Sequence, residues 1–250
     1  EVIPAFAEMT TSPCIKSHLS GSSMKLAERV LPMPNPSLEE DNSVEAISSV
    51  VIVGANGSGK TRLGAWVDLE SPEMEKAHRI SAQKSLSMPE VVRPKSVEEA
   101  ENELLYGRAN VDNRNRHNYK LGQRWQRKPA VALLNDFNQL LVYLFSDEFD
   151  KNTAYKNQMK EAKEKIEPPE TSLDQIKQIW EELLPHRQLA IRGGKIEAVR
   201  PDDSNSRYGA YKMSDGERLA FYLIGQCLSA PEDGIVIIDE PEIHLHRSVQ

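Results

Sequence analysis

Two apolar segments and the residues that follow them predict an α/β fold with a parallel sheet. Residues 48–53 form a short run rich in β-branched side chains, and a glycine-rich stretch separates it from a helix expected to begin near Lys60. Residues 235–238 form a second, continuous apolar run, typical of a strand buried on both faces. A strand, a glycine loop, a helix and a later buried strand are the parts of an open α/β sheet.

The glycine-rich stretch matches the pattern GxxxxGK[ST] from Gly54 to Thr61. Glycines at these positions let backbone N–H groups turn onto phosphate oxygens at a helix N-terminus. In this pattern the lysine reaches the β and γ phosphates and the threonine ligates Mg²⁺, so we expect ATP and Mg²⁺ as cofactors. The alternative is a plain glycine turn. The expected nucleotide ligands are Gly54, Asn56, Gly57, Ser58, Gly59, Lys60, Thr61 and Arg62.

The second apolar run ends in two acids, Asp239 and Glu240. Open α/β sheets place their ligands at the carboxyl ends of the strands. We expect Asp239 to hold the hydration shell of Mg²⁺ and Glu240 to polarise the attacking water, with Lys60 as the second catalytic residue. Alone the pattern is weak, but together with the glycine loop it predicts a nucleoside triphosphatase.

Composition excludes few functions. The chain has 250 residues, 39% hydrophobic and 28% charged, and its net charge of −7 gives no overall attraction to nucleic acid or an anionic membrane. No apolar run reaches the roughly 18 residues of a membrane span, and no secretion signal is visible. Cys14 and Cys227 are too few for a disulfide framework, and Cys227 is expected in the core. We expect a cytoplasmic protein, and a fragment, because the chain begins at Glu1.

The sequence divides into four expected segments. Residues 1–47 form an arm with a short helix near 24–30, and residues 48–94 form the half that contains the glycine loop and a strand near 78–82. Residues 95–186 form a helical insertion and residues 187–250 the remaining half. Helices are expected at 97–106, 131–144 and 173–184, and a hairpin around Gly193-Gly194.

Residues 213–218, Met-Ser-Asp-Gly-Glu-Arg, stand before an apolar helix and about twenty residues ahead of Asp239. Ser214 and Glu217 have the spacing of a capping box, so a simple helix cap is one interpretation. The segment also resembles the signature motif of ABC-type ATPases, with Ser214 and Gly216 matching. The resemblance implies a P-loop NTPase of ABC-ATPase type with an inserted helical lobe, and a homodimer or higher oligomer in which this motif completes the partner's ATP site.

The run from Glu240 to His246 resembles the segment that follows the acids in ATPases related to Rad50, RecF and the overcoming-lysogenisation-defect proteins. A metal site at His244 and His246 is the less favoured alternative, since no third ligand is in view. Gln83, after the strand expected at 78–82, is where the resemblance would place a glutamine of the nucleotide site. Its switch histidine would lie beyond Gln250.

Residues 106–128 combine basic and aromatic side chains with one acid, Asp112. Such interleaving suits nucleic acid or an acidic protein, and a solvated surface loop is the equal alternative. The basic residues are Arg108, Arg114, Arg116, Lys120, Arg124, Arg127 and Lys128, and the aromatic ones Tyr119 and Trp125.

Three segments, VGANGSGKTRLGAW, HRISAQKSL and DEPEIHLH, are similar to the ATPases of the PARIS anti-phage defence systems. That similarity implies an ATPase subunit that assembles with ATP and controls a partner effector, a Toprim-type nuclease. One rival is a DNA-repair ATPase that binds DNA through residues 106–128. A nucleotide-binding subunit of a membrane transporter is a weaker rival.

Overall fold

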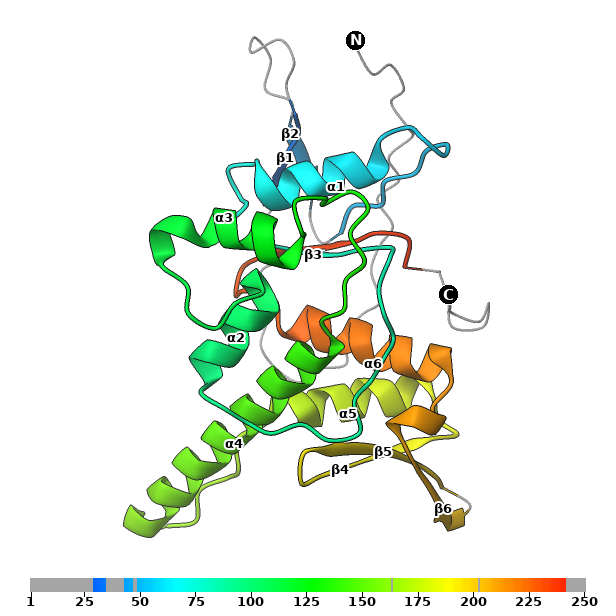
Figure 1. The fold of residues 1–250 in the computed structure, drawn as a ribbon. Coiled ribbons are helices and arrows are strands. Elements are labelled where there is room, and N and C mark those ends of the chain that lie inside the picture. The colour runs from blue at the N-terminus through cyan, green and yellow to red at the C-terminus, as the bar shows by residue number, and fades with distance from the viewer. Residues whose placement is uncertain (1–28, 35–42, 47–48, 163, 202, 242–250) are drawn as a thin grey trace.

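The computed structural model describes residues 29–34, 43–46, 49–162, 164–201 and 203–241 (Figure 1). Its larger helices are α1 (Lys60–Leu69), α2 (Val97–Tyr106), α4 (Phe137–Glu161), α5 (Ser172–Leu183) and α6 (Asp215–Leu228). Short turns of helix are η1 (Asn113–Asn115), α3 (Arg116–Tyr119), η2 (Lys120–Arg124) and η3 (Ala210–Lys212). The mixture of helices and strands is compatible with the predicted α/β class.

Strands β3 (Ala77–Ile80) and β7 (Ile235–Ile238) form a parallel pair, so of the two apolar runs only residues 235–238 lie in the sheet. Ile80 pairs with Ile238, and the Asp239 N–H donates to the Ile80 carbonyl at 3.0 Å. The carboxyl ends of both strands therefore lie together, as parallel pairing requires. Figure 1 shows this pair between α1 and α6.

The strand predicted at residues 48–53 is wrong for the part that the structure describes. Residues 49–53 form no strand, and Val51 and Val53 are 51% and 57% exposed. A strand exists only where its N–H and C=O groups join a ladder, and in the described part β3 and β7 pair only with each other. The apolar composition of this segment is real, but it is not buried in a sheet.

The N-terminal arm also departs from expectation. Strand β1 (Arg29–Pro32) pairs antiparallel with β2 (Ser43–Ala46), so Arg29 and Val30 are extended rather than helical. The rest of the helix expected near residues 24–30 lies outside the described residues.

The main hydrophobic core joins the middle of the chain to its C-terminal part. Leu140, Leu144, Ile176, Trp180 and Phe221 are buried in one cluster that α4, α5 and α6 share with the strands β4 (Gln188–Arg192) and β5 (Lys195–Arg200). The predicted hairpin is confirmed, because β4 pairs antiparallel with β5 across Gly193-Gly194, both of which have positive φ. A third strand, β6 (Asp203–Gly209), extends this sheet.

The helix predicted from residue 131 begins later, after Asp136. Leu134 is instead bound to the chain that follows β3: its N–H donates to the Gln83 carbonyl at 3.0 Å, and its carbonyl accepts from Ser85 at 2.7 Å. Backbone groups committed to this bridge cannot also make helical hydrogen bonds. Tertiary pairing therefore outweighs the apolar periodicity over 131–136, and α4 runs on to Glu161.

Candidate nucleotide-binding site

The glycine loop ends in a helix N-terminus whose backbone donors are left open. Gly57 and Gly59 have φ values of 81° and 98°, the left-handed region that favours glycine, and Gly59 precedes the first residue of α1. No side chain caps α1 and its first turn contains no acid. The first N–H groups of a helix have no partner within it, and the helix dipole is positive there. This end of α1 is suited to phosphate.

Lys60 lies over the same loop. Its Nζ donates to the carbonyl of Gly54 at 2.6 Å and to that of Ala55 at 3.2 Å. The ammonium group therefore faces back toward the loop whose N–H groups would hold phosphate. A phosphate oxygen, which carries negative charge, would be a stronger acceptor for it than these neutral carbonyls. The lysine and the loop fit a triphosphate.

Asp239 is brought against α1 from the other end of the sequence. A Cβ built on Gly64 would lie 3.1 Å from Asp239 Oδ1, and Gly64 follows Thr61 by three residues on the helix. Residues three apart on a helix share a face, so Thr61 projects from the same side of α1 as Gly64, one turn nearer the glycine loop. Two oxygen ligands of this kind suit Mg²⁺. The structure thus brings Asp239 against the helix that carries Thr61, although the two residues are about 180 positions apart in the sequence.

An arginine that the sequence reasoning missed holds the aspartate. Arg79 Nη2 and Nε donate to Asp239 Oδ2 at 2.6 and 3.0 Å. Burial raises the pKa of Asp239, and the Arg79 charge and its hydrogen bonds act in the opposite direction. No local signal could have revealed this pair, since the two residues are 160 positions apart.

Glu240, the expected catalytic acid, is exposed and has a φ of 47°. A residue other than glycine is uncommon in this left-handed region, and holding it there costs roughly 1–3 kcal/mol. The strain turns the chain sharply at the end of β7. Glu240 thereby leaves the strand direction directly after Asp239, the residue that lies against α1.

Gln83 and Arg62 are both exposed. Gln83 lies beyond the carboxyl end of β3, next to the end of β7, and its backbone is fixed by the bridge to Leu134. Its position is therefore on the sheet edge expected for a nucleotide ligand, with the side chain open to solvent. Lys84, the next residue, is buried and its charge lowers the pKa of Asp239, a second contribution that sequence reasoning did not find.

The turn at Ser214 forms the predicted capping box. The Glu217 N–H donates to Ser214 Oγ at 3.2 Å, and the Ser214 N–H donates to Glu217 Oε2 at 2.7 Å. Glu217 also accepts from Tyr208 Oη at 2.8 Å and Arg187 Nε at 3.2 Å. Burial raises the pKa of Glu217, but these hydrogen bonds outweigh it and the net pKa is lowered. Ser214 itself is exposed.

The Ser214 turn lies far from the β3–β7 pair, which carries Asp239. The other end of α6 meets β3, where His78 Nε2 donates to Gln226 Oε1 at 2.7 Å. Twelve helical residues separate Ser214 from Gln226, which amounts to roughly 18 Å at 1.5 Å per residue. The exposed turn thus faces away from the β3 end of its own helix.

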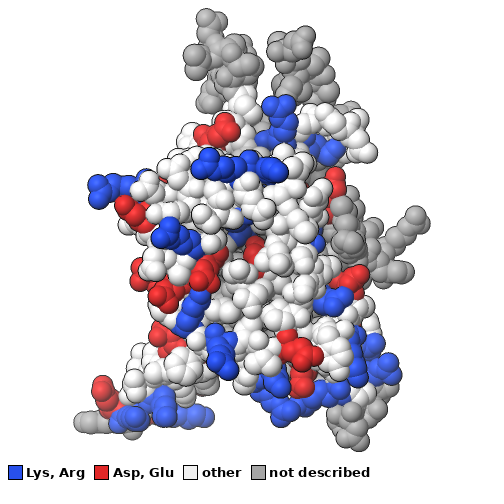
Figure 2. Space-filling view, in the orientation of Figure 1, with Lys and Arg blue, Asp and Glu red and all other residues white. Residues whose placement is uncertain are grey.

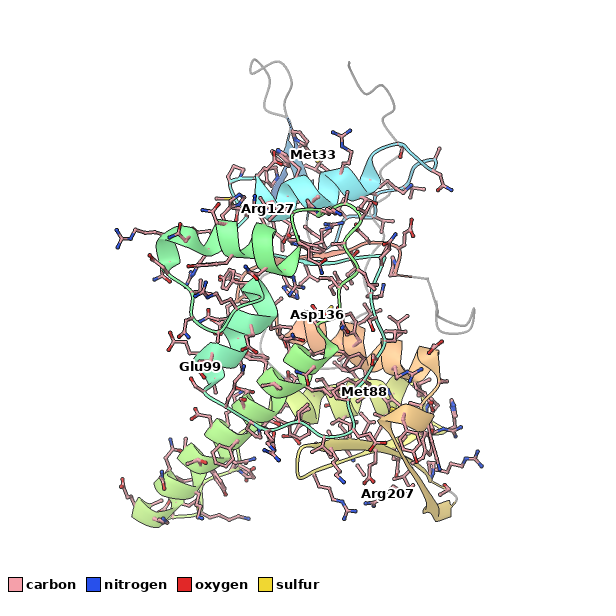
Figure 3. The ribbon with its side chains drawn as sticks, in the orientation of Figure 1. Met33, Met88, Glu99, Arg127, Asp136 and Arg207 are labelled. Carbon is pink, nitrogen blue, oxygen red and sulfur yellow. The ribbon has the colours of Figure 1, made fainter. Side chains whose placement is uncertain are left out.

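Residues 106–128 differ from the predicted basic surface. Lys120, Arg124 and Trp125 are buried: Lys120 pairs with Asp68 at 2.7 Å, and Arg124 with Asp136 at 3.2 Å. These charges stabilise the interior and are not available to nucleic acid. Figure 3 shows Asp136 between the start of α4 and α6. The exposed basic side chains that remain are Arg108, Arg114, Arg127 and Lys128, and on the face in Figure 2 basic groups stand beside acidic ones.

One smaller expectation is also wrong. Cys227 is exposed rather than part of the core. Its neighbours Leu223 and Ile224 are partly buried against the core, so the apolar face of α6 turns past the cysteine.

Comparison with known proteins defines the class. Residues 70–250, more than half of the chain, match the family described as "AAA domain, putative AbiEii toxin, Type IV TA system". The chain belongs to this family of P-loop ATPases, which implies a domain that binds nucleotide and Mg²⁺. The match includes α6, β7 and Asp239, and begins after the glycine loop. No curated protein and no solved structure matches the chain.

None of the helices in the described residues is long and apolar enough to cross a membrane. These residues contain no group of three or more His, Cys, Asp or Glu side chains that could hold a metal ion, and His244 and His246 lie outside them.

Proposed function

We propose that this chain is an ATPase subunit that binds Mg²⁺ and ATP between the glycine loop and Asp239 and hydrolyses the γ phosphate. One observation carries the proposal: Asp239 Oδ1 lies 3.1 Å from the Cβ position of Gly64, on the helix that the glycine loop opens. The loop and the acid are useful together only if they act on one ligand. Lys60 and the open N-terminus of α1 supply the positive charge that a triphosphate requires.

Thr61 and Asp239 are the residues that would hold Mg²⁺, which neutralises charge on the β and γ phosphate oxygens when bound. Lys60 exchanges its carbonyl partners for phosphate oxygens. Glu240, exposed beside Asp239, orients a water and accepts its proton. Gln83 and Arg62 stand open at the same edge and are available to the nucleotide or its water.

The site is completed, in this proposal, by a second copy of the chain in the manner of ABC-type ATPases. The support is geometric: Ser214 is exposed, Gly216 follows it half-buried in the first turn of α6, and Ser214 lies roughly 18 Å along the helix from Gln226, the residue that contacts β3. A turn so placed is accessible to a nucleotide held by another molecule. The assembly would form with ATP and separate after hydrolysis.

We further propose that the assembled ATPase controls a partner effector in anti-phage defence, with a Toprim-type nuclease as the candidate. This part rests on the similarity of the three short segments to the PARIS ATPases. DNA-stimulated hydrolysis by the ATPase alone would favour the DNA-repair alternative instead.

Glu240→Gln tests the catalytic assignment. The amide keeps the shape of the side chain but cannot accept a proton, so the rate of ATP hydrolysis should fall about 10²- to 10⁴-fold while ATP affinity is retained. Calorimetry and phosphate release measure the two quantities separately. Full turnover in the variant would place the base elsewhere, and loss of ATP affinity as well would show that Glu240 acts in binding.

A mixing experiment tests the shared site. A dimer of one Lys60→Ala chain and one Ser214→Arg chain has one composite site with both defects and one with neither. Partial return of hydrolysis on mixing two inactive proteins supports sites shared between copies. No return in dimers shown to be mixed by two affinity tags would overturn the composite arrangement.

A further inference from the structure

The strongest feature that the proposed chemistry does not yet use is the buried guanidinium of Arg79. This side chain is 0% exposed and every edge of it is occupied. Nε and Nη2 donate to Asp239 Oδ2, Nη1 donates to the Pro129 carbonyl at 2.7 Å, and the guanidinium lies 4.7 Å from the centre of the Trp125 ring. Hydrogen bonds and packing from two segments, the end of β7 and residues 125–129, thus fix its orientation.

Both contacts from Arg79 to the acid fall on the same oxygen. Oδ2 receives hydrogen bonds at 2.6 and 3.0 Å, whereas Oδ1 lies toward α1, 3.1 Å from the Cβ position of Gly64. A carboxylate held by one oxygen cannot rotate freely about its χ2 bond. The arginine therefore decides which oxygen of Asp239 is presented to the helix that follows the glycine loop.

The glycine at position 64 bears on the same geometry. It stands inside α1, where glycine costs about 1 kcal/mol relative to alanine. A Cβ there would come within 3.1 Å of Asp239 Oδ1 and 3.3 Å of Arg79 Nε. It would also lie 3.3 Å from Ile237 Cγ2, so these three neighbours would have to give by a few tenths of an ångström to admit it. The absence of a side chain at Gly64 thus keeps the arginine and aspartate in place against α1.

We propose that Arg79 is a positioning residue that holds Oδ2 of Asp239 so that Oδ1 serves the metal ion or its water beside Thr61. The proposal rests on the function proposed above for Asp239. The alternative role for the Arg79–Asp239 ion pair is to hold β3 against β7. The backbone ladder already pairs these two strands at four residue pairs. The two roles differ in what they do to metal-dependent binding.

The test uses Arg79→Lys, which keeps the charge but cannot present two donors to one oxygen while a third holds Pro129. Affinity for a non-hydrolysable ATP analogue is measured by calorimetry with Mg²⁺ and again with EDTA. Mn²⁺ binding is followed by electron paramagnetic resonance. We expect the gain in affinity due to Mg²⁺, and the affinity for Mn²⁺, to fall about 10- to 100-fold, as when an outer partner of a metal ligand is removed. Affinity in EDTA should stay within about twofold of the wild type, since Lys60 and the loop are intact.

Two matched variants serve as controls for the effect of Arg79→Lys on metal-dependent binding. In an Asp239→Asn background, Arg79→Lys should have no further effect on the metal gain, because the oxygen it positions is no longer a carboxylate. Gly64→Ala leaves Arg79 and Asp239 in the chain but crowds both, and should lower the metal gain in the same direction. It replaces Arg79→Lys as the deciding variant if that protein does not fold, as judged by circular dichroism.

The outcomes separate the two claims. An unchanged metal gain in the deciding variant, or equal losses with Mg²⁺ and in EDTA, would overturn the positioning role and leave the proposed function standing. A wild-type protein with no nucleotide affinity under either condition would overturn the proposed function and the positioning role with it.

Discussion

Two helix N-termini of this molecule each have glycine and serine within a few residues of the first turn, but they differ in how the positive end of the helix dipole is balanced. Helix α1 begins after Gly59 in a left-handed conformation, with no side-chain cap and no acid in its first turn. Helix α6 begins after Ser214 with a complete capping box and two acids, Asp215 and Glu217, in its first turn. The first terminus has open donors, and the second already contains its own carboxylate.

The difference indicates which terminus can bind an anion within a single chain. At α1 the backbone donors and the dipole are available, and Lys60 adds a movable positive charge. At α6 the carboxylate of Glu217 takes the N–H of Ser214 and is itself held by Tyr208 and Arg187. Binding phosphate at α6 therefore needs the rest of the site to come from elsewhere, which agrees with the proposed second copy.

The largest effect is expected from Lys60→Ala at the open terminus. The change deletes the charge that pairs with the β and γ phosphates, and we expect the affinity for ATP to fall at least about 100-fold. Calorimetry measures it, and the unfolding midpoint checks the fold. The matched change at the other helix is Lys212→Ala, on the exposed η3 turn before α6, which should leave affinity unchanged. Equal affinities in Lys60→Ala and wild type would remove the glycine loop from the site.

Ser214→Arg is expected to have the next largest effect, on assembly rather than on binding. A long cation in the exposed turn would block contact with a second chain, so ATP-dependent association and hydrolysis should be lost while each monomer binds nucleotide through Lys60. Light scattering with and without ATP, together with phosphate release, measures this. Normal turnover per folded molecule would mean that the α6 terminus is only a cap.

Acid should loosen the contact between β3 and α6. Burial, then the charge of Arg124, lowers the pKa of His78 to about 3. Unfolded histidine titrates near 6.5, so below that pH the unfolded chain takes up a proton that the folded chain excludes, and stability falls between about pH 6.5 and about pH 3. The expected slope from this group is at most about 1.4 kcal/mol per pH unit.

Denaturant unfolding of wild type and His78→Gln at several pH values isolates that contribution. The variant should be less stable at pH 7, because the buried contact with Gln226 changes, but its stability should fall less steeply below pH 6.5. Parallel curves for the two proteins would show that His78 does not cause the acid sensitivity.

The parts of the site that could be predicted from sequence are those whose signals are local. The glycine loop, the capping box at Ser214 and the Gly193-Gly194 hairpin each depend on residues within a few positions of one another. The role of Arg79 could not be predicted, since its partner Asp239 is 160 residues away and many other arginines precede Asp239 in the chain. The sequence pattern predicts Arg124 and Lys120 on the surface, because composition says nothing of the buried Asp136 and Asp68 that neutralise them.

Secondary structure shows the same limit. The run at 48–53 has strand composition, but no ladder partner for it lies in the described part. The helix expected from residue 131 begins at Phe137, because Leu134 is bound to Gln83 and Ser85. The local pattern alone decides neither conformation: the first segment lacks a pairing partner among the described residues, and the second is held by a remote one.

The smallest effect expected, and the one that separates capping from assembly most cleanly, is that of Ser214→Ala. Removing the hydroxyl that accepts the Glu217 N–H should lower the free energy of unfolding by about 1 kcal/mol. Ser214→Asp, which retains an acceptor at the cap, should recover most of that stability. If the turn also contacts the phosphate of a nucleotide bound to a second chain, the aspartate would repel that phosphate. Ser214→Asp should then be the more stable variant but assemble slowly with ATP. Ser214→Ala should be less stable and assemble more readily than Ser214→Asp. Urea unfolding and ATP-dependent light scattering on the same two proteins measure stability and assembly.

If the more stable Ser214→Asp protein also assembles better, Ser214 acts only as the cap of its own helix. If Ser214→Asp assembles more slowly than Ser214→Ala despite its higher stability, a phosphate lies beside Ser214 in the assembly.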